Sequence, residues 1–246
     1  MKNYRLVVQY DGTDYAGFQI QPLERTIQGE LEKALATLAS EKIRIAGAGR
    51  TDSGVHSEGQ TISFRTEKLT VPVERLPYAF NSLLPKDIRV IESEIMPSDF
   101  HARYSALEKT YRYQIYESEF ENVFYRRYAY WTRTALDWEA IKSCTKLFIG
   151  TKDYASFAAS GSSVKTTVRT ISKVEVHNEG FLKTISFTAD GFLYNMVRNL
   201  VGTLVDVGLG RLSLQQVDAI MESRDRRLAS ATMAPQGLFF ESVKYS

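Results

Sequence analysis

Cysteine and long apolar runs are nearly absent from this sequence. The single cysteine among 246 residues, Cys144, excludes an internal disulfide and a zinc site built from several cysteines. One thiol is typical of a reducing compartment. No segment approaches the roughly 18 consecutive apolar residues of a membrane helix, and the N-terminus lacks the apolar core of a signal peptide. We therefore expect a cytoplasmic protein without a membrane segment.

An excess of one charge and the common cofactor motifs are also missing. The 31 Lys and Arg residues against 29 Asp and Glu give a net charge of +2, which is compatible with a local basic patch but does not predict one. There is no P-loop, no complete dinucleotide fingerprint and no G-x-S-x-G elbow. The 3 histidines are far apart and lack a nearby cluster of metal-ligand side chains. We therefore expect no metal and no nucleotide cofactor, so that any catalysis uses Asp, Glu, Tyr, Arg or Lys.

The order of predicted elements indicates an α+β fold. The first hundred residues predict strands and helices in the β-α-β-β-α-β order of ferredoxin-like domains, with helices on one side of a mainly antiparallel sheet. These are strands at 5–10, 43–46, 61–66 and 88–95, and helices at 27–38 and 74–84. The remainder is similar but larger, with strands at 111–116, 168–176, 182–188 and 238–245, and helices at 138–148, 192–207 and after 213. We expect two halves, residues 1–103 and 104–246.

The densest polar cluster is the glycine-rich loop around residues 49–56. One interpretation is a tight turn in which the Asp52 side chain accepts bonds from nearby amides and Arg50 is solvated. The other is a binding loop, in which glycines bring the backbone close to a ligand while Asp52 and Arg50 face it. The local pattern by itself favours the turn.

Two further segments allow more than one interpretation. Aromatic residues interleaved with arginines between 111 and 133 suit RNA, since bases stack on rings and guanidinium groups hold phosphates. The same residues would also suit a buried strand face with an arginine fringe. In the 192–207 helix, Met196, Leu200 and Leu204 form a core stripe, and Arg198 beside them needs an anionic partner if it is buried.

Taken together, motifs spread over nearly the whole chain resemble the tRNA pseudouridine synthase I (TruA) family. They are Tyr10-Asp11-Gly12-Thr13, Gly17-Phe18-Gln19, Gly49-Arg50-Thr51-Asp52 with Gly54-Val55-His56, Phe100-His101-Ala102-Arg103, Lys109-Thr110-Tyr111-Arg112-Tyr113, residues 192–202 and Ala234-Pro235-Gln236-Gly237-Leu238. The Arg-Thr-Asp-x-Gly-Val-His stretch is highly specific. Two departures are small: Ser57 replaces the usual alanine, and Phe239-Phe240 replaces an aliphatic or tyrosine pair.

The resemblance implies a fold, an activity and a set of site residues. The fold would be a mixed, mostly antiparallel sheet of two fused ferredoxin-like halves flanked by helices, the pseudouridine synthase fold, with the active cleft between the halves. The protein would isomerise uridine to pseudouridine at positions 38, 39 and 40 of the tRNA anticodon arm, as a homodimer. Asp52 would be the catalytic residue and Arg198 its ion-pair partner. Tyr111 would stack on the uracil, Leu238 would form the apolar wall behind it, and Arg50 would hold the flipped nucleotide.

Two alternatives belong to other classes. A non-catalytic RNA-binding protein with paired ferredoxin-like sheets would keep the aromatic and basic face but would not need Asp52 beside Arg198. A cofactor-free small-molecule enzyme on an α+β scaffold would not need the fringe of aromatic and arginine residues. Release of tritium from tRNA labelled at uridine C5 separates all three hypotheses.

Overall fold

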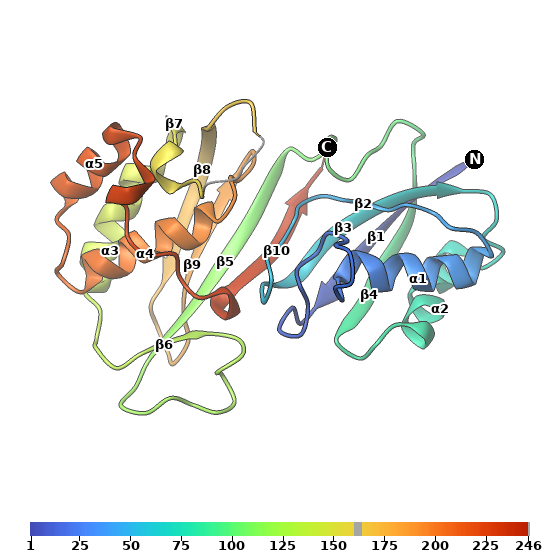
Figure 1. Cartoon of the computed structure of the whole chain (residues 1–246), viewed down its shortest axis with the longest axis horizontal. Helices are drawn as coiled ribbons and strands as arrows, with labels where there is room; N and C mark the ends of the chain where they lie inside the picture. Colours follow the sequence, from blue (N-terminus) through green and yellow to red (C-terminus); the bar gives the residue numbers. More distant parts are fainter. Residues whose placement is uncertain (160–163, 246) are drawn as a thin grey trace. The chain divides into compact units, whose positions relative to one another are not determined.

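A computed structural model describes residues 1–159 and 164–245 (Figure 1). The chain divides into two compact units. Unit 1 contains residues 1–107 together with the C-terminal segment from Phe239 onward, and unit 2 contains residues 108–238. Each unit is described separately below.

Unit 1 has the strand arrangement of a ferredoxin-like domain. Its strands are β1 (Lys2–Tyr10), β2 (Ala46–Gly47), β3 (His56–Thr66) and β4 (Ile88–Met96). They lie in the order β4-β1-β3-β2, and every neighbouring pair is antiparallel. The strand β10 (Leu238–Lys244) pairs in parallel with the start of β3, through Phe239 opposite His56 and Phe240 opposite Ser57. The sheet is therefore mixed and mostly antiparallel.

The helices of unit 1 are α1 (Ile27–Ala39) and α2 (Leu76–Leu83), the latter preceded by a 3₁₀ turn at Val73–Arg75. Thr26 caps α1, its hydroxyl accepting the Gly29 N–H at 3.2 Å, which satisfies a backbone donor that the helix leaves unpaired. Ile27, Leu31 and Leu35 follow at helical spacing and are buried. Each such side chain contributes about 1.5–3 kcal/mol when it is fully buried, so this face attaches α1 to the core.

The strand predicted at residues 43–46 forms only from Ala46, as β2. Ile43 and Ile45 are buried as an alternating pattern requires, but no strand forms before Ala46. The backbone of Ile45 is bonded by α1 side chains instead, because its N–H donates to Glu32 Oε1 at 3.1 Å and its carbonyl accepts from Gln28 Nε2 at 3.4 Å. Side-chain partners thus replace the ladder that the alternation predicted.

Unit 2 is also built on a mostly antiparallel sheet. Its strands are β5 (Glu108–Glu117), β6 (Tyr130–Thr132), β7 (Gly150–Asp153), β8 (Val168–His177) and β9 (Lys183–Ala189). The order is β5-β9-β8-β7 with antiparallel neighbours, and β6 pairs in parallel with β5. The predicted α+β class, with a mixed and mostly antiparallel sheet flanked by helices, is confirmed.

The helices of unit 2 are α3 (Trp138–Thr145), α4 (Met196–Gly208) and α5 (Leu214–Ser223), with 3₁₀ turns at Lys146–Phe148, Ala155–Phe157, Arg226–Leu228 and Pro235–Gly237. The predicted stripe of Met196, Leu200 and Leu204 on α4 is buried. The helix begins at Met196 rather than at residue 192, because Asn195 has φ 58° and ψ 8°, a left-handed conformation that a right-handed helix cannot contain. None of the described helices is long and apolar enough to cross a membrane.

Candidate active site

Asp52 lies in a short turn between β2 and β3. The turn is closed by a bond from the Val55 N–H to the Asp52 carbonyl at 3.1 Å, and Gly54 has φ +77°. Thr51 is buried, Asp52 is partly buried and Arg50 is exposed. A tight turn therefore forms through the backbone carbonyl of Asp52, and Arg50, two positions before Asp52, is more exposed than it.

Two buried polar side chains hold residues 49–51, the backbone that leads into Asp52. The Tyr10 hydroxyl, at the end of β1, is hydrogen-bonded to Thr51 Oγ1 at 2.8 Å. Gln60 on β3 binds both backbone groups of Gly49, donating from Nε2 to its carbonyl at 2.9 Å and accepting its N–H at 3.2 Å. Burial raises the pKa of Tyr10 to about 12, so this hydroxyl stays neutral around pH 7 and acts as a fixed hydrogen-bonding group.

The segment 11–18 lies directly against the same turn. The Phe18 N–H donates to the Thr51 carbonyl at 3.0 Å. A Cβ atom at Gly17, which has φ +101°, would lie 2.8 Å from the Thr51 carbonyl oxygen, and one at Gly12 would lie 2.0 Å from that of Val55. A side chain at either glycine would therefore push the two segments apart.

The two small departures from the family motifs are neighbours at the β3–β10 pairing. Ser57 Oγ donates to the Phe240 carbonyl at 3.0 Å and accepts the Gln60 N–H at 2.8 Å. The Phe239 ring stacks on His56 with 4.8 Å between centroids. Ser57 thus supports the strand segment that carries Gln60 and does not enter the Asp52 turn.

In unit 2, Tyr111 and Tyr113 point to the same face of β5, since alternate residues of a strand share a face. Tyr111 is buried and its ring meets Phe192 edge-on, with 5.0 Å between centroids. The Tyr113 hydroxyl donates to the Ala234 carbonyl at 2.7 Å. Leu238 is also buried, at 5% exposure.

Arg198 is held at the start of α4 by two acceptors. Its Nε donates to the Met233 carbonyl at 2.6 Å, and one of its terminal nitrogens donates to Asn195 Oδ1 at 2.8 Å. Burial raises the pKa of Tyr113, and the positive charge of Arg198 partly opposes that rise. Residues 233–234 therefore link Arg198 to Tyr113 on β5.

A second polar network binds residues 226–233 to α4. Asn199 is fully buried, and its Oδ1 accepts from Thr232 Oγ1 at 2.6 Å and from Arg226 at 2.8 Å. A Cβ atom at Gly202 would lie 2.2 Å from the Ala231 carbonyl oxygen. This close packing fixes the path of residues 226–233, which lead to Leu238.

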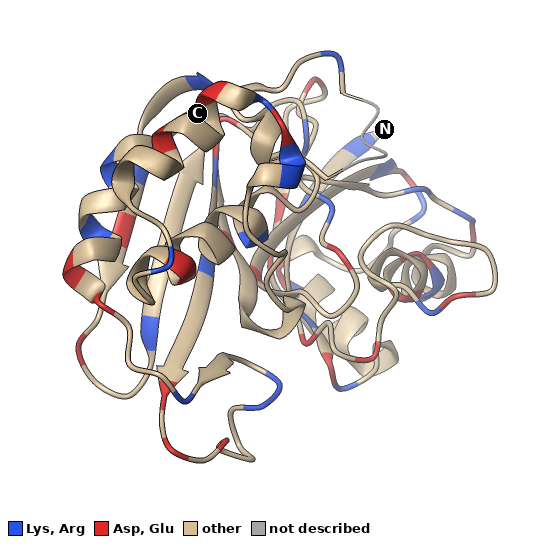
Figure 2. Ribbon diagram, turned by 60° about the vertical axis from the view of Figure 1, so that its left-hand side comes forward, with Lys and Arg blue, Asp and Glu red and all other residues tan. Residues whose placement is uncertain are grey.

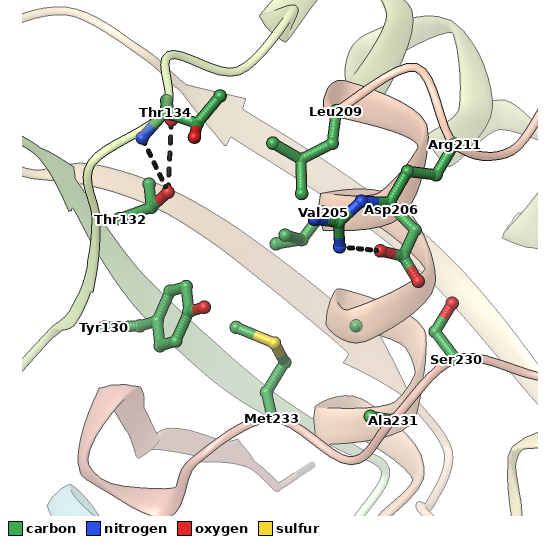
Figure 3. A pocket seen from close by; sticks show the side chains of 11 residues that line it. Tyr130, Thr132, Thr134, Val205, Asp206, Leu209, Arg211, Ser230, Ala231 and Met233 are labelled. Atoms are coloured by element: carbon green, nitrogen blue, oxygen red, sulfur yellow. Dashed lines mark hydrogen bonds and ion pairs between the residues drawn. The ribbon is translucent and has the colours of Figure 1, made fainter.

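A hollow of about 230 Å³ is lined by residues of this segment, of α4 and of β6 (Figure 3). Tyr130 and Met233 line one part of it, and Asp206, which is paired with Arg211 at 3.1 Å, lines another. None of the predicted site residues borders this hollow. It approaches them only through Met233, whose carbonyl accepts from Arg198.

The loop between β5 and β6 carries the interleaved aromatic and arginine residues. Phe120 and Phe124 are 76% and 82% exposed, whereas Tyr125 packs against Phe181 with 5.1 Å between centroids. The strand part of the cluster is core, and the loop part is surface. Lys and Arg are interspersed with Asp and Glu over the chain, and the loop carries both signs (Figure 2). Neither interpretation of the cluster applies to all of it.

The predicted site residues are divided between the two units. Arg50 and Asp52 lie two positions apart in unit 1, while Tyr111, Arg198 and Leu238 belong to unit 2, where the carbonyls of Met233 and Ala234 accept from Arg198 and Tyr113 respectively. The supporting residue Gln60 was missed, because a buried amide leaves no local signature in the sequence. Within residues 1–159 and 164–245, no three His, Cys, Asp or Glu side chains could hold a metal ion.

Comparison with known proteins gives consistent full-length matches. The family described as tRNA pseudouridine synthase matches residues 6–105 and 144–246. A tRNA pseudouridine synthase A of Halalkalibacterium halodurans is 47% identical over 97% of this chain and 90% of its own length. Those of Acetivibrio thermocellus and Bacillus subtilis are each 43% identical, over 100% and 98% of both chains respectively.

The likeness to solved structures is much weaker. A crystal structure of a Cbf5-Nop10-Gar1 complex is 12% identical, with a TM-score of 0.36, over 82% of this chain and 53% of that chain. This chain thus spans about half of that chain, and a likeness at this level supports no conclusion. The full-length matches do: this chain belongs to the tRNA pseudouridine synthase family.

Proposed function

We propose that this protein isomerises uridine to pseudouridine at positions 38, 39 and 40 of the tRNA anticodon arm. The observation that carries the proposal is the family match over residues 6–105 and 144–246. The matched residues include the Asp52 turn, whose backbone is hydrogen-bonded to Phe18 before Asp52 and is closed by Val55 after it. The substrate positions rest on the motif resemblance. So do the homodimer and a cytoplasmic location, where tRNA is found.

The reaction needs few chemical groups. The N1–C1′ bond of the nucleotide breaks, the uracil turns, and C5 joins to C1′. The proton on C5 then leaves and N1 takes up a proton, so atoms and electrons balance without an oxidant or an energy donor. One ionised carboxylate suffices, as a nucleophile toward the ribose or base, or as a base that removes a ribose proton. We assign this role to Asp52, with Arg198 as its ion-pair partner.

The remaining assignments concern the uracil and its nucleotide. A uridine in a stem must leave the stack, which costs a few kcal/mol. Stacking on an aromatic ring returns about 1–3 kcal/mol per base, and we assign that contact to Tyr111. Leu238 provides the apolar wall and Arg50 holds the flipped nucleotide. Residues 1–103 thus supply Asp52 and Arg50, and residues 104–246 supply the other three.

The test is release of tritium from tRNA carrying uridine labelled at C5, without added metal or nucleotide. We expect release from tRNA with uridine at positions 38–40 and none from tRNA with cytidine there. Binding without release would favour a non-catalytic RNA-binding protein. Sedimentation tests the dimer separately, and a species of one chain at assay concentration would contradict it.

A further inference from the structure

Polar side chains around the Asp52 turn form a hydrogen-bonded series that starts on β3, passes through β1 and ends at the residue before Asp52. The Gln60 amide lies 3.5 Å from the Tyr10 hydroxyl, which is hydrogen-bonded to Thr51 Oγ1 at 2.8 Å. All three side chains are buried, with exposures of 4% for Tyr10, 0% for Gln60 and 6% for Thr51. A buried polar network of this kind fixes one arrangement when its members are bonded.

We propose that Tyr10, Thr51 and Gln60 are positioning residues that set the place and direction of the Asp52 carboxylate during catalysis. This inference rests on the proposed function. It assigns no chemistry to the three residues, because each acts through the backbone of the turn.

Hydrogen bonds to the backbone connect these three side chains to Asp52. The Thr51 hydroxyl is bonded to Tyr10, and the Thr51 carbonyl accepts the Phe18 N–H at 3.0 Å. Both bonds therefore hold the residue whose peptide unit leads into Asp52. Gln60 binds both backbone groups of Gly49, and so it holds the backbone three positions before Asp52. We expect that loss of one bond leaves the fold intact but lets the peptide before Asp52 rotate.

The expected consequence is on rate rather than on affinity. A displacement of about 1 Å at a reacting group can cost around 10²-fold in rate. tRNA affinity comes mostly from phosphate contacts, which these buried side chains cannot make. A purely structural role would lower the melting temperature and leave the rate unchanged at temperatures where the protein is folded.

The test is single-turnover tritium release, with tRNA binding measured alongside, for Tyr10→Phe, Thr51→Val, Thr51→Ser and the Tyr10→Phe/Thr51→Val double variant. Tyr4→Phe is the matched control, since Tyr4 lies on the same buried face of β1 and stacks on Phe64 at 5.3 Å. We expect Tyr10→Phe and Thr51→Val to react at least about tenfold more slowly with unchanged tRNA affinity. Thr51→Ser, which keeps the hydroxyl, should retain the rate, as should Tyr4→Phe.

The double variant should be no slower than the slower single variant, because both substitutions remove the same bond. Wild-type rates in folded Tyr10→Phe or Thr51→Val, or losses that multiply in the double variant, would overturn the inference. If Tyr10→Phe does not fold, the comparison of Thr51→Val with Thr51→Ser decides by itself. An inactive wild-type protein would instead refute the proposed function, and this inference with it.

Discussion

Asp52 and its neighbour Thr51 have different roles in the turn: Thr51 makes structural hydrogen bonds, and Asp52 carries the carboxylate. The Thr51 hydroxyl, the Ser53 hydroxyl and backbone groups make bonds around the turn that do not use the Asp52 carboxylate. A change at the Asp52 carboxylate can therefore test chemistry without dismantling the support around it.

The first prediction concerns Asp52→Asn. We expect it to abolish isomerisation and to leave tRNA affinity within a few-fold of wild type, because the amide is nearly isosteric but is neither a nucleophile nor a base. Tritium release and filter binding measure the two effects. Asp218→Asn, at an exposed position on α5, is the matched control. Turnover by the pure Asp52→Asn protein would remove Asp52 from the catalytic role.

The second prediction concerns Arg198. Lysine keeps the charge but loses the planar fork that reaches both the Met233 carbonyl and Asn195 Oδ1. We expect Arg198→Lys to lower the single-turnover rate by about tenfold or more, and Arg198→Met, which also lacks the charge, to be slower still. Arg211→Lys, just beyond α4 and 68% exposed, should react like wild type. An unchanged rate in Arg198→Met would contradict the proposed partnership with Asp52.

At the scale of elements, Glu117 joins β5 to two neighbours. Its carboxylate pairs with Lys183 of β9 at 2.6 Å and accepts from the Leu136 N–H at 3.0 Å and Trp138 Nε1 at 2.7 Å. Burial alone would raise the pKa of Glu117, but these partners outweigh it and lower the pKa below its usual value. The ionised form is therefore the one that the fold stabilises.

The third prediction follows from the lowered pKa of Glu117. A carboxyl whose pKa is lower in the folded state adds stability above its unfolded pKa and loses it as the pH falls through the folded one. Glu117→Gln should cost about 1–3 kcal/mol of unfolding free energy at pH 7, and the difference from wild type should shrink below about pH 4. Urea unfolding at several pH values measures this. Glu119→Gln, 68% exposed, should stay within about 0.5 kcal/mol, and a pH-independent cost for Glu117→Gln would refute the ion-pair account.

At the scale of the whole molecule, the near-neutral net charge of +2 requires that contacts with tRNA phosphates be local. Association should nevertheless depend on salt, because each neutralised phosphate releases counterions. The exposed β5–β6 loop is one place for such contacts, since it presents Arg126 and Arg127 beside exposed phenylalanines.

The fourth prediction is that log K for tRNA falls with log salt by roughly 0.7–0.9 per phosphate contacted. Arg126→Ala and Arg127→Ala should each make that slope shallower, and Arg44→Ala, at a 76% exposed arginine after α1, should leave it unchanged. Equal slopes for the two loop variants and the wild type would show that the phosphate contacts lie elsewhere on the chain.

The sequence by itself determined those features that local patterns encode. Thr26 and the spacing of Ile27, Leu31 and Leu35 specify α1, because a cap and an apolar face act within a few turns of chain. The Arg-Thr-Asp-x-Gly-Val-His stretch singled out Asp52 and indicated the family. These features could be predicted because their determinants are contiguous in sequence.

Only the tertiary structure decided the support around Asp52 and the extent of several strands. Tyr10 and Thr51 are 41 positions apart, and Ser57 and Phe240 are 183 apart, so no local pattern joins them. β3 begins at His56 rather than at residue 61, and its first residues pair with β10 from the other end of the chain. Ile43 and Ile45 alternate as a strand would, but α1 side chains bond the Ile45 backbone. In each case the deciding hydrogen-bond partner is distant in sequence, and only the folded path of the chain brings it within bonding distance.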